Sequence, residues 1–381
     1  MKYKTAIIDV DIDVKSFNKY EGSVSFYMVH ATSVVRLYNH DIVNTLYSHG
    51  GYCLDYFFLG ANRTVDCFIL INKDISGKGN IDDLVMALEW CVESNVNLIS
   101  MSIGTTHYID SAKLFIVVNH IVKKGICLIA SADNNGCITY PACFDGCIGV
   151  QVEVASLLAQ TPYAFIPNSF NGINIFINPN TLKGDVIRSN SFATAYFSGY
   201  LSISLTTEHI NLEHIKKWLT AEFGHHESQK ALIHSVKSIL PPCEENVIII
   251  AVQNLCKTNL EKFCSKLQDL FITSDYFCVT VYTNKTEDTT INTEFASFKH
   301  LFHEYYGCSY AEFVDLIIRM CCPSIVLVDY AAYNECGSSK EVDVILYTQD
   351  NLVDSSNILM LNIKEDCNVN SIYNKIINYY E

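Results

Sequence analysis

The chain has 381 residues, of which 49% are hydrophobic and 18% charged, so it is not a disordered protein and is long enough for two packed domains. Its formal net charge of -15 excludes a general nucleic-acid binder, because contacts to phosphates need a basic face, but it is compatible with a basic peptide as partner. The chain contains no apolar run of the roughly 18 to 20 residues that a membrane span requires. These features indicate a soluble globular protein.

Strands and helices are predicted to alternate along the first 205 residues. The segment 82–94, for example, has apolar residues at helical spacing behind an acidic first turn, Asp82-Asp83, and so predicts a helix. The predicted strands are 4–8, 64–71, 98–103 and 126–130, with a further one at 173–177, and the predicted helices are 31–48, 82–94 and 112–124. Such an order predicts a mostly parallel sheet covered by helices on both faces, with the ligand site at the carboxyl ends of the strands.

Polar residues stand where these strands end. Asp9, the segment Ser102-Ile103-Gly104 and Asn134 each lie at the carboxyl end of a predicted strand, so they are expected at one edge of the sheet. Ser191, in Ser189-Asn190-Ser191-Phe192-Ala193-Thr194-Ala195, precedes an apolar helix start, where amides and the helix dipole favour developing negative charge. A helix N-cap serine explains the same pattern when it is taken alone.

Four segments of the chain resemble sequence motifs of the subtilisin-like serine peptidases. The serine segment is similar to G-T-S-M-A-[ST]-P, and Asp9 in AIIDVDID takes the place of the aspartate in D-[ST]-G. His30 in His30-Ala31-Thr32-Ser33-Val34 takes the place of the histidine in H-G-T-H-V, and Asn134 that of the asparagine in A-A-G-N-[ED]-G. The chain order Asp, His, Ser is the one found in this family.

The resemblance implies a doubly wound α/β fold and an acyl-transfer enzyme, a serine endopeptidase that needs no cofactor. Asp9 is expected to orient His30, His30 to act as general base for Ser191, and Asn134 to donate to the oxyanion. Two backbone segments are expected to bind an extended peptide as β-strand edges. They are Ser102, Ile103, Gly104 and Ala130, Ser131, Ala132.

The sequence also departs from the family pattern. Asp11, Ser33, Asp133 and Ala195-Tyr196 replace motif residues, and Asp133 would oppose a neighbouring oxyanion unless its carboxylate points away. The spacing from Asp9 to His30 is short for the family, which indicates a missing surface loop. A second function therefore stays open, that of a catalytically inactive peptide-binding or scaffold protein.

The N-terminus and the cysteines suggest where such a protein works. Asp9 is only the ninth residue, which leaves no room for a signal peptide or a propeptide, and the 16 cysteines include no CxxC pair. Reduced thiols are therefore expected rather than disulfides or zinc, and the location is expected to be cytoplasmic. A small cytoplasmic peptidase of this kind suits a dedicated substrate, such as a ribosomally made precursor peptide.

A second α/β domain is predicted after the segment 241–245, so the expected domains are 1–240 and 246–381, with the helix 212–223 packing on the first. Strands are expected at 246–252, 277–282, 324–329, 343–347 and 358–361, and helices at 260–271, 310–320 and 371–380. The turn 251–258 has the length and the Lys-Thr ending of a phosphate loop, but Ala251 and Cys256 replace its glycines. We therefore expect no ATP or GTP binding and interpret the domain as a substrate-recognition or partner-docking module.

Overall fold

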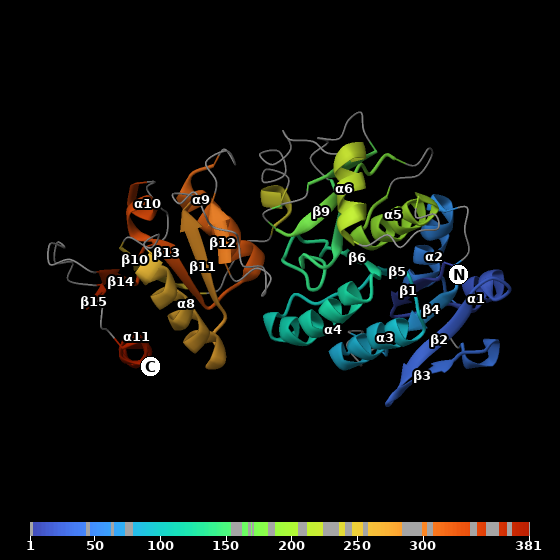
Figure 1. Ribbon diagram of the computed structural model, residues 1–381, viewed down its shortest axis with the longest axis horizontal. Coiled ribbons are helices and arrows are strands. Elements are labelled where there is room, and N and C mark those ends of the chain that lie inside the picture. The colour runs from blue at the N-terminus through green and yellow to red at the C-terminus, as the bar shows by residue number, and fades with distance from the viewer. Residues whose placement is uncertain are drawn as a thin grey trace. The chain divides into compact units, whose positions relative to one another are not determined.

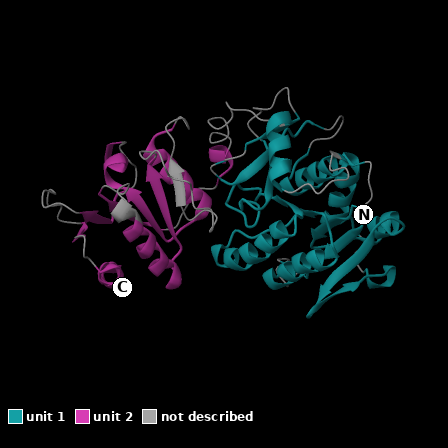
Figure 2. Ribbon diagram, viewed as in Figure 1, with its two compact units in different colours: residues 1–231 teal, residues 232–381 magenta. Residues whose placement is uncertain are grey.

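The computed structural model describes two compact units, residues 1–231 and 232–381 (Figures 1 and 2). The described residues are 3–42, 46–61, 65–72, 79–153, 162–166, 169, 171–181, 187–204, 212–223, 236–240, 246–253, 258–283, 299–302, 308–335, 341–347, 358–363 and 368–380. Among the helices within these ranges, none combines the length and the apolar character needed to span a membrane. Residues 254–257 of the predicted turn 251–258 and the whole of the predicted boundary segment 241–245 fall outside the described residues.

The first unit is built on a nine-stranded sheet of order β3-β2-β4-β1-β5-β6-β7-β9-β8. Every neighbouring pair is parallel except the two at the edges, β2 with β3 and β8 with β9, so the predicted mostly parallel α/β fold is confirmed. The strands are β1 Thr5–Asp9, β2 Ser25–His30, β3 Ser33–Arg36, β4 Cys67–Leu70, β5 Leu98–Met101, β6 Cys127–Ser131, β7 Ile148–Val152, β8 Tyr163–Phe165 and β9 Ile173–Ile177.

Helices cover both faces of this sheet (Figure 1). On one face α3 packs beside α4, and on the other α2 crosses α5, which lies over β5, β6 and β7. The helices are α1 Val14–Tyr20, α2 His49–Gly60, α3 Ile81–Glu93, α4 Ser111–Lys123, α5 Asn190–Ser204 and α6 Leu212–Phe223, with short 3-10 turns at Asn39–Asp41 and Tyr108–Asp110.

The central strands are buried along their whole length. All residues of β1, β5, β6, β7 and β9 are buried, because helices cover both of their faces. Their side chains on the face of α2 and α5 form a core with Phe57 of α2 and Phe197 of α5, both 0% exposed. The polar residues at the strand ends are therefore held on a rigid layer.

The prediction of a helix over residues 31–48 is wrong. The chain instead forms a hairpin in which Val29 of β2 pairs with Val34 of β3, and α2 begins only at His49. The reversal occurs at Ala31, whose φ of 53° lies in the left-handed region that tight hairpin turns use. The segment 25–36 is rich in aromatic and β-branched residues, which suit a pleated edge better than a helix.

The second unit contains a six-stranded, fully parallel sheet of order β12-β11-β13-β10-β14-β15. Its strands are β10 Ile248–Val252, β11 Cys278–Thr283, β12 Lys299–Phe302, β13 Ile325–Asp329, β14 Val344–Tyr347 and β15 Leu359–Asn362. Its helices are α8 Thr258–Thr273, α9 Tyr310–Cys321, α10 Tyr330–Glu335 and α11 Val369–Tyr380. A separate core, which includes Leu267, Phe271 and Ile376, lies between this sheet and the helices α8 and α11.

The division between the units precedes the expected linker. Val236 and Leu240 are buried, and the Arg319 guanidinium of α9 donates to the carbonyls of Lys237 and Leu240. These contacts attach the residues just before 241–245 to the second unit, which is why the unit starts at residue 232 rather than at 246.

Helices α2 and α5 touch backbone to backbone. A Cβ atom on Gly199 would lie 2.2 Å from the Phe57 carbonyl oxygen, and one on Gly60 would lie 2.2 Å from the Tyr196 carbonyl oxygen. Only glycine permits this separation, and the contact sets where the N-termini of both helices lie.

We expect Gly199→Ala to lower the free energy of unfolding by about 1 to 3 kcal/mol, because the added methyl group must push two packed helices apart. Chemical denaturation measures the change. Gly22→Ala is the matched control, since a Cβ at Gly22 meets no atom within 4 Å. Equal effects of the two substitutions would contradict the proposed close contact.

Candidate active site

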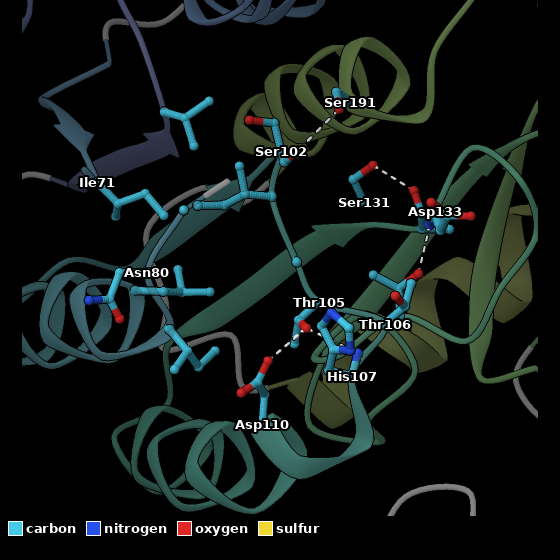
Figure 3. A pocket seen from close by; sticks show the side chains of 18 of the residues that line it. Ile71, Asn80, Ser102, Thr105, Thr106, His107, Asp110, Ser131, Asp133 and Ser191 are labelled. Carbon is cyan, nitrogen blue, oxygen red and sulfur yellow. Dashed lines mark hydrogen bonds between the residues drawn. The ribbon is translucent and has the colours of Figure 1, made fainter. Parts of the chain in front are cut away.

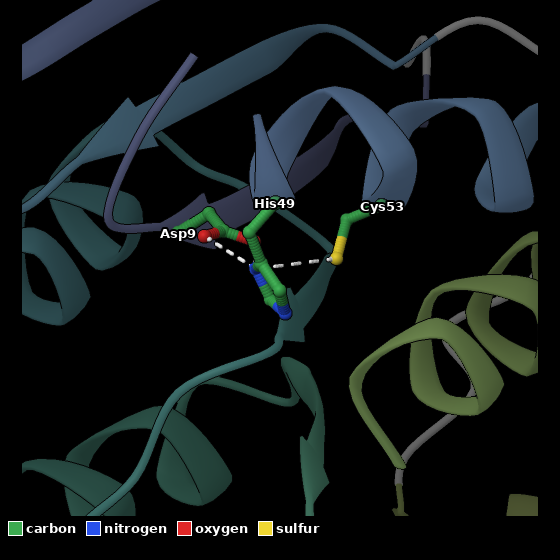
Figure 4. A group of neighbouring side chains, drawn as sticks. All are labelled: Asp9, His49 and Cys53. Carbon is green, nitrogen blue, oxygen red and sulfur yellow. Dashed lines mark hydrogen bonds and ion pairs between the residues drawn. The ribbon is translucent and has the colours of Figure 1, made fainter. Parts of the chain in front are cut away.

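The Asp9 carboxylate at the end of β1 holds the imidazole of His49, the first residue of α2 (Figure 4). His49 Nδ1 lies 3.0 Å from Asp9 Oδ1 and 3.1 Å from Oδ2. Asp9 is 0% exposed, whereas the His49 side chain is 35% exposed. One ring nitrogen thus faces the buried charge, and the imidazole reaches the surface.

The expectation that Asp9 orients His30 is wrong. His30 is the exposed last residue of β2, where it pairs with Ser33 in the edge hairpin, and Asp9 contacts His49 instead. With His49 in this place the spacing to Asp9 is no longer short, because α1, β2 and β3 lie between the two residues. No surface loop needs to be missing.

The sequence contains a signal for His49 that motif matching passed over. His49-Gly50 reproduces the first two residues of H-G-T-H-V, while His30 is followed by alanine. The glycine has a steric reason, since a Cβ on Gly50 would lie 2.0 Å from the Asp11 carbonyl oxygen. The pair Gly50-Gly51 indicates a turn when the sequence is taken alone, which hides the helix start.

Interactions with three residues, His49, Ser102 and Val10, stabilise the ionised form of Asp9. Burial alone would raise the pKa of this carboxyl, but the hydrogen bond and charge interaction with His49, the Ser102 hydroxyl and the Val10 amide together lower its pKa below the usual value. The Val10 amide donates to Oδ1 over 2.7 Å, and Ser102 Oγ donates to Oδ2. Asp9 therefore remains an anion beside the imidazole.

Cys53, one turn after His49, completes a compact group with Asp9 and His49 (Figure 4). Its Sγ lies 3.9 Å from His49 Nδ1, and ligand atoms of the three residues all lie within 4.8 Å of one another. Burial and the neighbouring Asp9 raise the pKa of the Cys53 thiol well above its usual value. A neutral, buried thiol is a poor metal ligand and a poor nucleophile, so Cys53 serves as packing beneath the imidazole.

Ser191 lies in the first turn of α5 and is buried. Its Oγ donates to the Ser102 carbonyl over 3.1 Å, so Ser102 binds Asp9 through its hydroxyl and Ser191 through its backbone. The ring of the next residue, Phe192, lies 5.5 Å from the His49 ring, centroid to centroid. The helices α2 and α5 thus bring the histidine and the serine to one place.

Asn190 fixes the serine turn to the neighbouring strands. Its side-chain amide donates to the carbonyls of Ala132 and Asp133 over 3.2 and 2.9 Å, and its Oδ1 accepts from Val152 over 2.8 Å. Its backbone N–H donates to Asn134 Oδ1 over 2.9 Å. Because the oxygen of the Asn134 side chain is engaged, its NH₂ group is left as the donor at the cleft, which Ser191 also lines.

Asp133 replaces a motif residue, and its carboxylate was expected to oppose an oxyanion unless it points away. In the structure this carboxylate binds amides of its own loop. Asp133 Oδ2 accepts from the amides of Asn135 and Cys137 over 2.8 and 3.4 Å. The N–H groups that bind this carboxylate thus belong to residues that follow Asn134 in the chain.

A cleft of about 670 Å³ opens beside Ser191 (Figure 3). Its walls include the expected substrate-binding residues Ser102, Ile103, Gly104, Ser131 and Ala132. The opposite part is lined by Val10, Ile71, Gly79, Asn80, Ile81 and Leu84, and the remaining lining residues are Thr105, Thr106, His107, Asp110, Asp133, Asn134 and Thr139.

The two expected peptide-binding segments differ in how far their backbone groups are already hydrogen-bonded. Ala130 is 0% exposed and pairs with Met101 on one side and Gly149 on the other, and the Ala132 amide donates to the Val150 carbonyl, so the assignment of 130–132 as an edge is wrong. The backbones of Ile103 and Gly104 form no hydrogen bond with any other described residue. The backbone groups of Ile103 and Gly104 thus remain available at the cleft, whereas the Ser102 amide donates to the Ile8 carbonyl and the Ser102 carbonyl accepts from Ser191 Oγ.

The free energy of unfolding at low pH should depend on the charge of Asp9. The pKa of Asp9 is lower in the folded than in the unfolded protein, so the ionised carboxylate stabilises the fold. This stabilisation is complete above the unfolded pKa of about 3.9 and is lost as the pH falls through the lower folded pKa. We expect the difference in unfolding free energy between wild type and Asp9→Asn to shrink as urea denaturation is repeated from about pH 6 to about pH 3. A constant difference for Asp9→Asn over this pH range would contradict the lowered pKa.

No family model matches the chain, but curated proteases do. The thermostable alkaline protease of Halalkalibacterium halodurans is 31% identical over 152 residues, which are 38% of this chain and 41% of the relative. The minor extracellular protease Epr of Bacillus subtilis is 28% identical over 105 residues, 27% of this chain and 15% of the relative. The chain thus spans less than half of the length of either protein.

The chain is also similar to solved structures, at lower sequence identity. A cold adapted subtilisin-like serine proteinase matches with a TM-score of 0.42 and 15% sequence identity, covering 58% of this chain and 82% of that one. The similarity to the curated proteases confirms the expected resemblance of this chain to the subtilisin-like serine peptidases.

Proposed function

We propose that the chain is a serine endopeptidase that hydrolyses peptide bonds through Asp9, His49 and Ser191. The observation that carries the proposal is the contact of His49 Nδ1 with the buried Asp9 carboxylate, linked through Ser102 to the Ser191 hydroxyl at the mouth of a cleft. The named relatives, which are proteases, support the same reaction class.

In this mechanism Asp9 accepts the Nδ1–H of His49 and thereby leaves Nε2 as the basic nitrogen. The Ser191 hydroxyl turns from the Ser102 carbonyl to His49, transfers its proton to Nε2 and attacks the scissile carbonyl. The imidazolium, stabilised by the Asp9 charge, then protonates the leaving amine. A water molecule repeats the two steps to release the acyl group from Ser191.

The oxyanion forms in this scheme between two donors. They are the Asn134 side-chain NH₂ group and the Ser191 backbone N–H at the start of α5. Asn134 is preorganised for this role because Asn190 holds its oxygen. The repulsion from Asp133 is reduced in this scheme, since the amides of its own loop bind its carboxylate.

The acyl side of the peptide is proposed to lie in the cleft as an added strand. Ile103 and Gly104 offer the backbone groups for it, and Gly79 and Asn80 form the facing wall. The apolar side chains of Ile71, Ile81 and Leu84 make part of the cleft suitable for large apolar substrate residues.

We further propose that the substrate is a dedicated one, such as a ribosomally made precursor peptide, and that the second unit recognises it. This unit has a core of its own, whereas all of the proposed catalytic residues lie in the first. Capture of the substrate by immobilised Ser191→Ala, followed by identification of the bound peptide by mass spectrometry, tests this assignment. A captured peptide that wild-type protein does not cleave would refute it.

A fluorophosphonate probe distinguishes the peptidase from an inactive peptide-binding relative, because it reacts only with an activated serine. We expect wild type to be labelled and Ser191→Ala to be unlabelled. His49→Ala should slow labelling by about 10³-fold or more, since the general base is lost. His30→Ala is the matched control and should be labelled at the wild-type rate; the reverse result for the two histidines would refute the proposed triad.

Asn134→Ala should lower kcat by about 10²- to 10³-fold with little change in KM, because its donor is used mainly in the transition state. Steady-state kinetics on a fluorogenic peptide measures both constants. Asn135→Ala should keep wild-type kinetics, because the backbone and not the side chain of Asn135 holds Asp133. A rise in KM alone for Asn134→Ala would make this residue a ground-state binding group.

A further inference from the structure

A row of aromatic rings leads outward from His49 on the side that does not line the cleft. The Phe192 ring lies 5.5 Å from those of His49 and Tyr52 and is stacked on Tyr56 at 5.0 Å. The Tyr52 ring in turn lies 4.4 Å from the Tyr47 ring. We name Phe192, Tyr52 and Tyr47 the aromatic shelf.

The shelf is open to solvent and yet held in place. Tyr52 is 44% exposed and Tyr47 is 38% exposed, whereas Tyr56 beneath them is 8% exposed. The Tyr47 hydroxyl donates to Asp55, and the Lys15 ammonium lies 5.3 Å from the Tyr47 ring centroid. A fixed, exposed aromatic surface needs little ordering when a ligand covers it.

The position of the shelf relative to the reacting groups indicates what covers it. The acyl part of the substrate occupies the cleft lined by Ser102–Gly104 and Asn134, and none of the shelf residues lines that cleft. His49 must protonate the leaving amine, so the residue that carries this amine lies against the imidazole. The shelf begins at the same imidazole, which places it beside the leaving part of the peptide.

We propose that the aromatic shelf binds a large apolar or aromatic side chain in the first or second residue after the scissile bond. The inference rests on the proposed peptidase function and adds a specificity that Tyr52 determines. Stacking on Tyr52 and Phe192 removes apolar surface from water on both partners and favours such peptides over those with glycine at this place.

Competition between amines for the acyl-enzyme tests the shelf separately from the cleft. The wild-type protein is given a peptide ester together with phenylalaninamide or glycinamide; the amine attacks the acyl group on Ser191, forms an amide and frees the serine hydroxyl. We expect phenylalaninamide to capture the acyl group about five- to twenty-fold better than glycinamide. Equal capture would overturn the proposal.

Variants assign the preference to the shelf. Tyr52→Ser should bring the ratio of the two amines close to one, and Tyr52→Phe should keep it, because the ring and not the hydroxyl is needed. Leu59→Ser, at a 63% exposed position near the far end of α2, is the matched control and should show the wild-type ratio. A wild-type ratio in Tyr52→Ser would refute the assignment.

A binding measurement keeps this proposal distinct from the peptidase function. Calorimetry on Ser191→Ala should detect the dipeptide amide Phe-Ala-NH₂ more strongly than Gly-Ala-NH₂, and adding Tyr52→Ser should abolish the difference. A wild-type protein that hydrolyses no ester would refute the proposed function, whereas equal binding of the two dipeptides would refute the shelf.

Discussion

The ionised carboxylate of Asp9, wholly buried at the end of a central strand, is the constraint on which the site depends. A buried charge is tolerated only when hydrogen-bond donors surround it, and here the donors come from the residue after β1, from the start of α2 and from the residue after β5. The need to satisfy one carboxylate therefore brings three separate segments together. Ser102 extends the arrangement to α5, because the same residue accepts the Ser191 hydroxyl.

Asn190 has a similar role on the opposite side of Ser191. It is 5% exposed, and its backbone and side chain form hydrogen bonds with Ala132, Asp133, Asn134 and Val152. These bonds tie the start of α5 to β6 and β7. The serine and the proposed oxyanion donor thus keep their separation without any direct bond between their side chains.

The closely crossing helices α2 and α5 carry His49 and Ser191 in their first turns, and two regions with different chemistry lie beside these residues. On one side the cleft offers backbone groups of Ile103 and Gly104 together with apolar side chains, and the acyl part of a peptide is proposed to bind there. On the other side the rings of Phe192, Tyr52 and Tyr47 present an apolar surface beside His49. The glycines at the crossing allow this arrangement, since side chains at Gly60 or Gly199 would push the helices apart.

The sequence by itself determined the alternation of buried strands and amphipathic helices, and with it the parallel sheet, because hydrophobic spacing depends on local chain geometry. It also placed Asp9, Asn134 and Ser191 at element ends, where the structure has them. Which histidine meets Asp9 was decided by tertiary structure alone, since a hairpin carries His30 to an exposed edge while α2 brings His49 from 40 residues away in the chain. In the same way, Ala130 lies at a strand end in the sequence, but only its pairing on both sides within the sheet shows that its backbone is not available to a peptide.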